Sequence, residues 1–230
     1  MIYNTFLKKS KQKKKIEFHF KIILIKMKFV IGVSGKLGSG KDYITTNVIL
    51  PVLEKHKQRY LQLAFSDQIK INVMTKNAIG YNDLYLRKTE KSRQLLQTEG
   101  TEVGRTADKD IWVNFLDNWI KVHSNRGIDT FVVSDVRFMN EFDYIKNYGG
   151  IMIKIVAHKR NNVRLLQESN GNQETYDKIS THLSECDLDS LNDDMFNLII
   201  YNDPEDPFDV VQLQNEFEEL LTFCKKVLVI

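Results

Sequence analysis

Short apolar runs alternate along this chain with stretches in which apolar residues recur at helical spacing. Runs rich in β-branched and aromatic residues favour buried strands, and they lie at 29–34, 60–65, 130–133, 151–156 and 196–201. Helical spacing and helix-starting residues predict helices at 41–57, 66–77, 110–122, 140–148 and 212–226. Strands that alternate with helices predict an α/β fold, with a mostly parallel sheet and helices on both of its faces.

Two long segments between these elements are polar. Residues 80–105 are rich in arginine and lysine, and residues 158–182 are basic, contain glycine and follow no strong period. Active sites that exclude water are often closed by mobile segments, so 158–182 is a candidate lid. In the helix predicted at 41–57, Pro51 cannot donate a backbone hydrogen bond, and we expect the helix to be interrupted or to end near it.

A glycine-rich sequence joins the first predicted strand to the first predicted helix. It reads G-K-L-G-S-G-K-D over residues 35–42 and fits G-x-x-x-x-G-K, the P-loop. This context aims backbone N–H groups and a helix N-terminus at a polyphosphate, and it predicts the three-layer sandwich of P-loop NTPases. Lys41 would bridge the β- and γ-phosphates of ATP. The predicted ATP-binding residues of the loop are Gly35, Lys36, Gly38, Ser39, Gly40, Lys41 and Asp42.

Asp42 stands where this loop usually has a serine or threonine, whose hydroxyl binds Mg²⁺. A carboxylate also offers the hard oxygen ligands that Mg²⁺ prefers, either directly or through a water. It would equally stabilise the first turn of the following helix, as a cap or through the helix dipole. Both interpretations of Asp42, metal ligand and helix cap, remain open on the sequence alone.

A second polar pair, Asp135 and Arg137, follows the strand predicted at 130–133. Ligands of open α/β sheets bind outside the carboxyl ends of the strands, so we expect this pair beside the P-loop. There Asp135 would hold Mg²⁺ or activate a hydroxyl, and Arg137 would clamp a phosphate in bidentate fashion. The plainer alternative is a capping aspartate followed by a solvated arginine.

Further arginines lie in the two polar segments. Arg93 and Arg105 lie in 80–105, and Arg160 and Arg164 lie in the lid candidate. Phosphoryl transfer to a small acceptor needs positive charge on both phosphates and on the charge that develops between them. We therefore place Arg160 among the catalytic candidates, although each of these arginines could equally be an ordinary surface residue.

Length and composition favour one domain in a reducing compartment. The chain has 230 residues, 42% of them apolar, which is enough for a substantial core. Cys186 and Cys224 make neither a disulfide framework nor a metal-binding pair, so we expect an intracellular, cytoplasmic protein. The apolar run at 22–25 is too short for a membrane helix, and no cleavable signal is evident.

The net charge of +3 hides an uneven distribution. Residues 1–28 hold nine lysines and one glutamate, which leaves 24 basic and 29 acidic residues for the remainder. A mildly acidic body gives no support for a nucleic-acid surface. We predict a basic, disordered tail at 1–27 ahead of a P-loop domain at 28–230. The tail could instead be a nuclear or polyanion-binding tag, and Met27 could be the true start.

Six motifs of one family occur together in this chain. They are G-K-L-G-S-G-K-D at 35–42, A-F-S-D-Q-I-K at 64–70, R-Q-L-L-Q-T-E-G-T-E-V-G-R at 93–105 with D-I-W at 110–112, V-S-D-V-R-F at 133–138 with N-E at 140–141, H-L-S-E at 182–185 with L-D at 188–189, and I-Y-N at 200–202. Together they resemble the deoxynucleoside monophosphate kinases of phages and large DNA viruses. The resemblance covers about residues 28–221.

The resemblance implies transfer of the ATP γ-phosphate to the 5′-phosphate of a deoxynucleoside monophosphate, which gives the diphosphate for DNA precursor synthesis. It implies small nucleotides as substrates, Mg²⁺ as cofactor with Asp42 and Asp135 as metal ligands, and a homodimer. Asp135 and Arg137 would lie between donor and acceptor, and Asn202 would belong to the loop on the adenine side. The acceptor site would be lined by Asp67, Lys70, Arg93, Gln97 and Arg105.

Two other functions remain open. Animal-type phosphomevalonate kinases share the G-K-x-x-S-G-K-D loop, an S-D-x-R motif and the S-E-C-x-L-D pattern found here at 184–189. The motif at 95–105 favours the nucleotide kinase, because the mevalonate branch does not carry it in this form. A non-catalytic ATP-binding module is the second alternative. Such a relative would be expected to have lost Lys41, Asp135 or Arg137, and all three are present.

Overall fold

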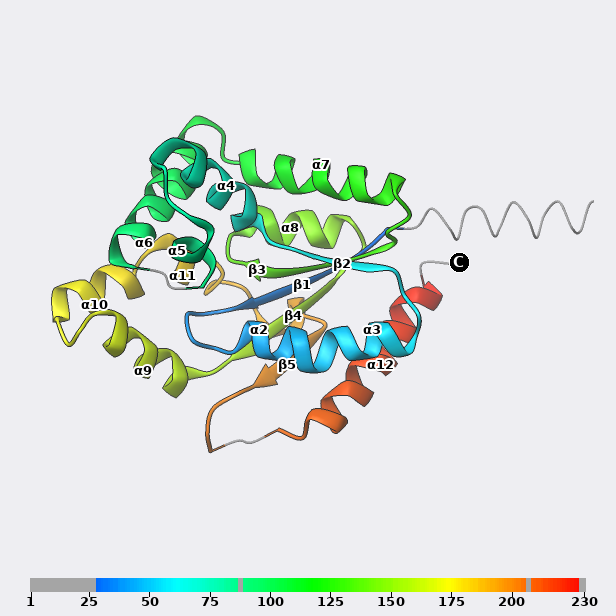
Figure 1. Ribbon diagram of the computed structural model, residues 1–230. Coiled ribbons are helices and arrows are strands. Elements are labelled where there is room, and N and C mark those ends of the chain that lie inside the picture. Colours follow the sequence, from blue (N-terminus) through cyan, green and yellow to red (C-terminus); the bar gives the residue numbers. More distant parts are fainter. Residues whose placement is uncertain (1–27, 87–88, 206–207, 228–230) are drawn as a thin grey trace, which may run out of the picture.

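Five parallel strands form the centre of the molecule (Figure 1). The computed structural model describes residues 28–86, 89–205 and 208–227. The strands are β1 (Phe29–Gly35), β2 (Tyr60–Leu63), β3 (Thr130–Val136), β4 (Ile151–Val156) and β5 (Leu198–Tyr201), in the order β2-β3-β1-β4-β5. The predicted parallel sheet is therefore confirmed. β3 is three residues longer than predicted, so Asp135 lies within the strand and not after it.

Alternation along the strands sends apolar side chains to both faces of the sheet. On one face, Ile31 and Val33 of β1 pack with Phe217 in a first core cluster. On the other face, Val30 and Val133 belong to a second cluster. These side chains are all fully buried, and each contributes roughly 1.5–3 kcal/mol relative to exposure to water. The sheet is thus the middle of three layers, as predicted for the P-loop NTPase fold.

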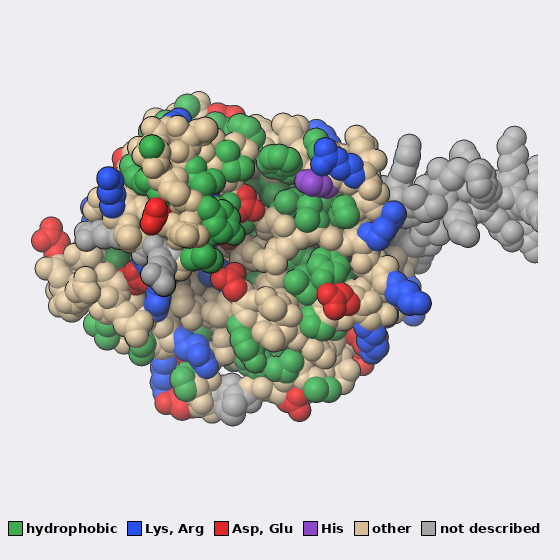
Figure 2. Space-filling view, in the orientation of Figure 1, with side chains coloured by type: hydrophobic (Ala, Val, Ile, Leu, Met, Phe, Trp, Pro, Cys, Tyr) green, Lys and Arg blue, Asp and Glu red, His purple; other side chains and the backbone are tan. Residues whose placement is uncertain are grey.

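Helices cover both faces, as Figure 1 shows. On the face of the second cluster lie α4 (Phe65–Asn77), α7 (Ile111–Asn125) and α8 (Met139–Asn147). The face of the first cluster carries α12 (Val210–Val227) and the helix that follows the P-loop, which consists of α2 (Lys41–Ile44), η1 (Thr45–Ile49) and α3 (Leu50–Lys55). In the space-filling view, hydrophobic side chains gather over α7, where Trp119 and Val122 are exposed (Figure 2).

Pro51 does not end the first helix. The helix runs to Lys55 and contains a π-helical turn at Thr45–Ile49, which ends two residues before the proline. Pro51 has no N–H to donate to the carbonyl of Asn47, four residues earlier. That carbonyl accepts a hydrogen bond of 2.7 Å from the Gln214 side chain on α12 instead. The interruption predicted here is therefore a widened turn that a neighbouring helix stabilises.

The two polar segments are helical. Residues 80–105 form α5 (Tyr81–Tyr85), α6 (Glu90–Gln97) and η2 (Thr98–Arg105), apart from the undescribed residues 87–88. The lid candidate contains α9 (His158–Glu168) and α10 (Gln173–Ser180), which α11 (Leu183–Cys186) and η3 (Asp193–Met195) follow. Apart from η3, these helices gather beyond the carboxyl ends of the strands (Figure 1). Both polar segments are thus placed at the edge where a parallel sheet binds ligands.

The structure bears on the predicted tail and on membrane helices to different extents. The predicted basic tail, residues 1–27, lies outside the described residues. Among the helices that are described, none is both long and apolar enough to cross a membrane.

Candidate active site

The P-loop follows a path that only glycine accommodates at two positions. Gly38 and Gly40 have φ angles of +75° and +89°, in the left-handed region. A Cβ atom on Gly38 would lie 2.7 Å from Cβ of Arg164, and one on Gly40 would lie 2.3 Å from Nδ2 of Asn202. The loop is therefore fixed by its own backbone conformation and by close contact with α9 and with the end of β5.

Two asparagines hold the loop through its carbonyl groups. Nδ2 of Asn161, on α9, donates to the carbonyl of Leu37 at 2.8 Å. The buried Asn202, directly after β5, donates to the carbonyl of Ser39 at 2.8 Å. Asn202 thus supports the P-loop from beneath, and its predicted place on the adenine side stays a prediction.

Several donors of the loop are left for a ligand. Among the described residues, the N–H groups of Gly38 and Gly40 have no acceptor, and the buried hydroxyl of Ser39 has no partner. Successive N–H groups in a glycine-rich turn form a concave site for anions. The loop therefore fits the polyphosphate predicted for it.

Lys41 points back into the loop. Its Nζ donates to the carbonyl groups of Gly35 at 2.5 Å and of Lys36 at 2.9 Å. Burial, followed by the positive charge of Arg137, lowers the pKa of Lys41 to about 7, against the opposing effects of Glu185, Asp42 and Asp135. These charged groups therefore lie near the ammonium group, and the predicted catalytic residues Lys41, Asp135 and Arg137 are brought into one region.

Asp135 caps a helix, although not one near to it in sequence. Its two carboxylate oxygens accept the N–H groups of Phe65 at 2.8 Å and Ser66 at 3.0 Å, at the N-terminus of α4. The capping alternative for this residue is therefore correct. It does not preclude metal binding, because each carboxylate oxygen keeps a further lone pair.

The carboxylates of Asp42 and Asp135 fit a Mg²⁺ ion that has few protein ligands. Asp42 is exposed in the first turn of α2, and Asp135 lies among the charged groups around Lys41. Within the described ranges, no group of three or more histidine, cysteine, aspartate or glutamate residues could hold a metal. Mg²⁺ at phosphate sites is typically held by one or two carboxylates, the substrate phosphates and waters.

Arg137 is held by protein partners and does not extend freely into solvent, so the alternative of a solvated arginine does not hold. Its guanidinium group pairs with the carboxylate of Glu185 and donates to the carbonyl of Ser184 at 3.1 Å. Its backbone N–H donates to Oε2 of Glu141 at 2.8 Å. Backbone and side chain are therefore both fixed, with the guanidinium group near Lys41.

The predicted acceptor residues lie in three groups around the site. Lys70 donates to Asp67 at 3.3 Å and lies 4.2 Å from the centre of the Tyr85 ring. Tyr85 in turn donates to Asp67 at 3.1 Å. Asp67 also accepts the N–H of Ala64, which stabilises the start of α4. The structure thus brings Asp67 and Lys70 together and adds Tyr85 to them.

Arg105 contacts Glu141 and Phe138, which lie close after Arg137 in the sequence. It donates to the buried Glu141 at 2.5 Å and stacks on Phe138, with 3.6 Å between the guanidinium carbon and the ring centre. Since Glu141 also accepts the backbone N–H groups of Arg137 and Phe138, this one carboxylate links both arginines.

Arg93 contacts the lid candidate. Glu168, at the end of α9, pairs with Arg93 on α6 and with Arg164, one turn earlier on α9. Gln97 lies one turn after Arg93, in the last position of α6. Arg160 is exposed at the start of α9, where its backbone N–H donates to Asp203. The predicted lid and the predicted acceptor segment are thus in contact through Glu168.

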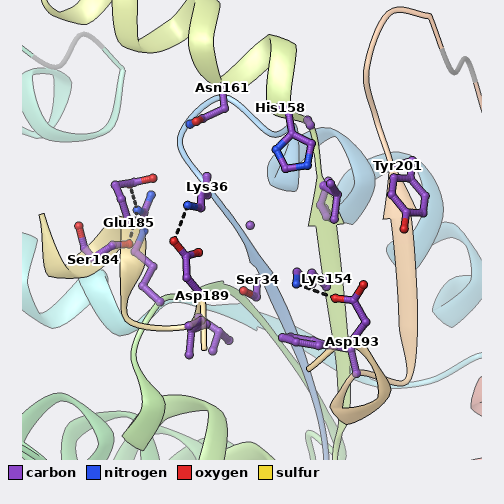
Figure 3. A pocket seen from close by; sticks show the side chains of 18 residues that line it. Ser34, Lys36, Lys154, His158, Asn161, Ser184, Glu185, Asp189, Asp193 and Tyr201 are labelled. Carbon is purple, nitrogen blue, oxygen red and sulfur yellow. Dashed lines mark hydrogen bonds and ion pairs between the residues drawn. The ribbon is translucent and has the colours of Figure 1, made fainter. Parts of the chain in front are cut away.

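A cavity of about 410 Å³ opens beside the P-loop (Figure 3). It lies between the ends of β1 and β4 and the segment that contains Ser184, Glu185 and Asp189. Figure 3 shows Lys36 paired with Asp189 and Lys154 paired with Asp193. The cations on this side of the loop are therefore matched by carboxylates from the segment at 184–193.

Sequence reasoning missed four of the residues that build this site. Glu185 and Glu141 lie inside motifs of the family resemblance, but no role followed from their positions. Glu168 and Asn161 lie in the lid candidate and carried no signal of their own. Each of them has at least one partner far away in the sequence, by 148 residues for Glu185 and Leu37 and by 36 residues for Glu141 and Arg105. A single sequence does not reveal such pairs. The four residues are Glu141, Asn161, Glu168 and Glu185.

Comparison with known proteins gives one family. The model of a family described as deoxynucleotide monophosphate kinase matches residues 49–204, a range that begins after the P-loop. A protein of Acanthamoeba polyphaga mimivirus, whose provisional name is deoxynucleotide monophosphate kinase, is 26% identical over 146 residues. The aligned region covers 55% of this chain and 72% of the mimivirus protein.

Two solved kinase structures resemble the chain distantly. An APS kinase of Mycobacterium tuberculosis, in complex with AMPPNP and APS, is 13% identical with a TM-score of 0.43, over 85% of this chain and 98% of that protein. A shikimate kinase from Acinetobacter baumannii, in complex with shikimate, is 13% identical with a TM-score of 0.44, over 86% of this chain and 94% of that protein. Neither similarity is close enough to bear on substrate or mechanism.

Proposed function

Because the chain belongs to the deoxynucleotide monophosphate kinase family, we propose that it transfers the γ-phosphate of ATP to the 5′-phosphate of a deoxynucleoside monophosphate. The products are ADP and a deoxynucleoside diphosphate. The observation that carries the proposal is the proximity of Lys41 and Arg137 at a P-loop whose Gly38 and Gly40 N–H groups have no acceptor among the described residues. The family match begins after this loop and includes Arg137, so the loop itself is the support that is independent of the match.

The chemistry needs positioning and positive charge more than a strong base. A phosphate oxygen of the acceptor is already a nucleophile at neutral pH, so the protein has to align two phosphates and stabilise the charge between them. Lys41 and the loop N–H groups would hold the donor phosphates. Arg137 would contact the transferred group, and Arg160 would reach it from α9.

Mg²⁺ would neutralise charge on the donor phosphates, with Asp42 and Asp135 as its protein ligands. On the acceptor side, Arg93 and Arg105 carry the positive charge that a monophosphate needs. Asp67, Lys70 and Gln97 would line the remainder of that site. Helices α9 and α10 would close over both nucleotides and exclude water.

A coupled assay of ADP release tests the proposed function. The protein is incubated with Mg·ATP and one acceptor at a time, namely dGMP, dTMP, dCMP, dAMP or 5-phosphomevalonate. ADP release that depends on a deoxynucleotide, with the diphosphate identified by ion-exchange chromatography, is the expected result. Turnover with phosphomevalonate alone would contradict the proposal. ATP binding without turnover on any acceptor would favour the non-catalytic module.

The Lys41→Ala variant is the matched control for this assay. We expect it to fold with an unchanged circular dichroism spectrum and to lose the ADP release, because the lysine that holds the donor phosphates is gone. Full turnover by this variant would show that the P-loop does not hold the donor.

A further inference from the structure

Glu185 reaches the P-loop from a distant part of the chain. Its Oε2 accepts the N–H of Leu37, inside the loop, at 2.7 Å. Its other oxygen pairs with the guanidinium group of Arg137. The side chain is only 8% exposed. Both of its carboxylate oxygens thus have partners in the protein, and little of the side chain is left to water.

The groups around this carboxylate are those that a phosphoryl group requires. A P-loop N–H and the Arg137 guanidinium group contact Glu185, and the Lys41 ammonium group lies near enough for the charge of Glu185 to raise its pKa. Each of them stabilises negative charge, and an arginine with a backbone N–H is a common partner of phosphate oxygens. Glu185 thus supplies, from within the protein, the negative charge that a ligand would supply from outside.

The segment around Glu185 is anchored independently of this contact. Asp187 accepts the N–H of Met139 at 2.8 Å, at the start of α8. Asp189 pairs with Lys36 at 2.7 Å. With anchors on the same segment, the Glu185 side chain can leave Leu37 and Arg137 while the segment stays in place.

We propose that Glu185 is an internal occupant of the phosphoryl position, and that the γ-phosphoryl group of a bound nucleoside triphosphate displaces it from Leu37 and Arg137. The proposal rests on the proposed function, since it assumes a phosphate ligand at the P-loop. Two anions cannot share this small set of donors without strong repulsion. Nucleotide affinity is therefore lower than the loop alone would give, and Arg137 is released to the ligand only when the triphosphate is in place.

The Glu185→Gln variant tests this displacement. Glutamine keeps the shape of the side chain, and its amide oxygen still accepts the N–H of Leu37, but the charged pair with Arg137 is lost. The probe is tripolyphosphate without metal, titrated by isothermal calorimetry into the full chain at pH 7. We expect the variant to bind the probe about five- to tenfold more tightly than the natural protein, because a neutral hydrogen bond is easier to break than a charged one.

The Asp194→Asn variant is the matched control. It removes the same charge from η3, but Asp194 is exposed and does not line the cavity beside the P-loop. Tripolyphosphate should bind this variant as it binds the natural protein. An equal gain in tripolyphosphate affinity in both variants would mean that any lost negative charge has this effect, and it would overturn the proposal. Unchanged or weaker binding by Glu185→Gln would also overturn it, and would assign Glu185 to holding Arg137 in place.

A measurement on the natural protein is independent of how the variant folds. The nitrogen-15 amide resonance of Leu37 should shift with tripolyphosphate along the same saturation curve as the calorimetric heat. A Leu37 resonance that stays unchanged while heat is released would overturn the proposal and leave the kinase function standing. No binding at all, together with no deoxynucleotide-dependent ADP release, would remove the proposed function as well.

Discussion

At the scale of single residues, Lys41 leads to a prediction about protons. Its pKa of about 7, lowered by burial and by Arg137, means that the amine is mostly neutral at pH 8. A bound polyphosphate raises this pKa, because negative charge stabilises the ammonium form. Binding at pH 8 should therefore take up to about one proton from solvent, and much less at pH 6 where Lys41 is already charged. Calorimetry in buffers of different ionisation heat measures this uptake.

The Lys41→Arg variant isolates the effect. Arginine stays charged at both pH values, so this variant should take up no proton through residue 41. Protons that the ligand itself gains or loses are the same for both proteins and cancel in the comparison. Equal uptake by the two proteins at pH 8 would contradict the lowered pKa of Lys41.

Glu141 leads to a prediction about stability. It is buried, it pairs with Arg105, and it accepts the backbone N–H groups of Arg137 and Phe138. Replacing it by alanine would leave a buried guanidinium group and two N–H groups without their acceptor. We expect Glu141→Ala to lower the free energy of unfolding by about 3–5 kcal/mol, measured by urea denaturation.

An exposed ion pair provides the comparison for Glu141. Glu218 pairs with Lys55 on the protein surface, where water competes for both charges. Glu218→Gln should leave the urea midpoint unchanged within error. If Glu141→Ala lowered the free energy of unfolding no more than Glu218→Gln does, burial would not strengthen the contribution of the Glu141–Arg105 pair to stability.

The sequence predicted the charged residues of the site better than their partners. Lys41 and Arg137 were expected together because each lies at or just beyond the carboxyl end of a neighbouring strand. Proximity of that kind follows from the topology of a parallel sheet. The position of the Glu185 carboxylate does not follow from the sheet topology. It lies on α11, which reaches the P-loop by a path that no local sequence pattern encodes.

At the scale of elements, the contact between α9 and the P-loop can be tested at Gly38. Gly38 and Gly171 share a φ angle of +75°, so alanine at either position has the same backbone cost of about 1–2 kcal/mol. Only at Gly38 would the new Cβ meet another residue, Arg164, whereas nothing lies within 4 Å of Gly171. Gly38→Ala should therefore weaken ATP binding at least about tenfold, which corresponds to about 1.4 kcal/mol. Gly171→Ala should leave ATP affinity unchanged.

Equilibrium titration with a fluorescent ATP analogue measures both affinities. Equal affinities for the two variants would mean that α9 does not constrain the loop, and the packing of Arg164 on Gly38 would then have no role in binding.

Elements that contribute to the core were predicted well, and elements that stand away from it were not. The central strands read as continuous apolar runs because both faces of the sheet are buried, and the long helices show a clear period because the core takes one side of each. In the lid candidate, α10 buries no residue and α9 buries only Leu165, while Val163 and Leu166 are exposed. Helices that stand away from the core leave no apolar stripe, so their sequence looked like a structureless polar segment.

At the scale of the whole molecule, internal carboxylates connect parts that the sequence keeps apart. Glu185 joins α11 to the P-loop, Glu141 joins η2 to the turn after β3, and Glu168 joins α9 to α6. All three bind arginines that a phosphate ligand would also attract. The protein thus holds its cationic site together by its own anions, in an arrangement that only the folded chain reveals.

Glu168 gives the prediction that concerns the molecule as a whole. Its side chain is 10% exposed and lies between Arg93 and Arg164, so Glu168→Ala would leave two guanidinium groups facing each other. Their repulsion should separate α9 and α10 from α6. Hydrogen exchange followed by mass spectrometry should then show faster exchange in 158–180 and 90–97, with β1 and β3 unchanged. Glu174→Ala, at an exposed position of α10, is the control and should exchange as the natural protein does. If Glu168→Ala also exchanged at the natural rate, the lid candidate would be held on the acceptor segment by other contacts.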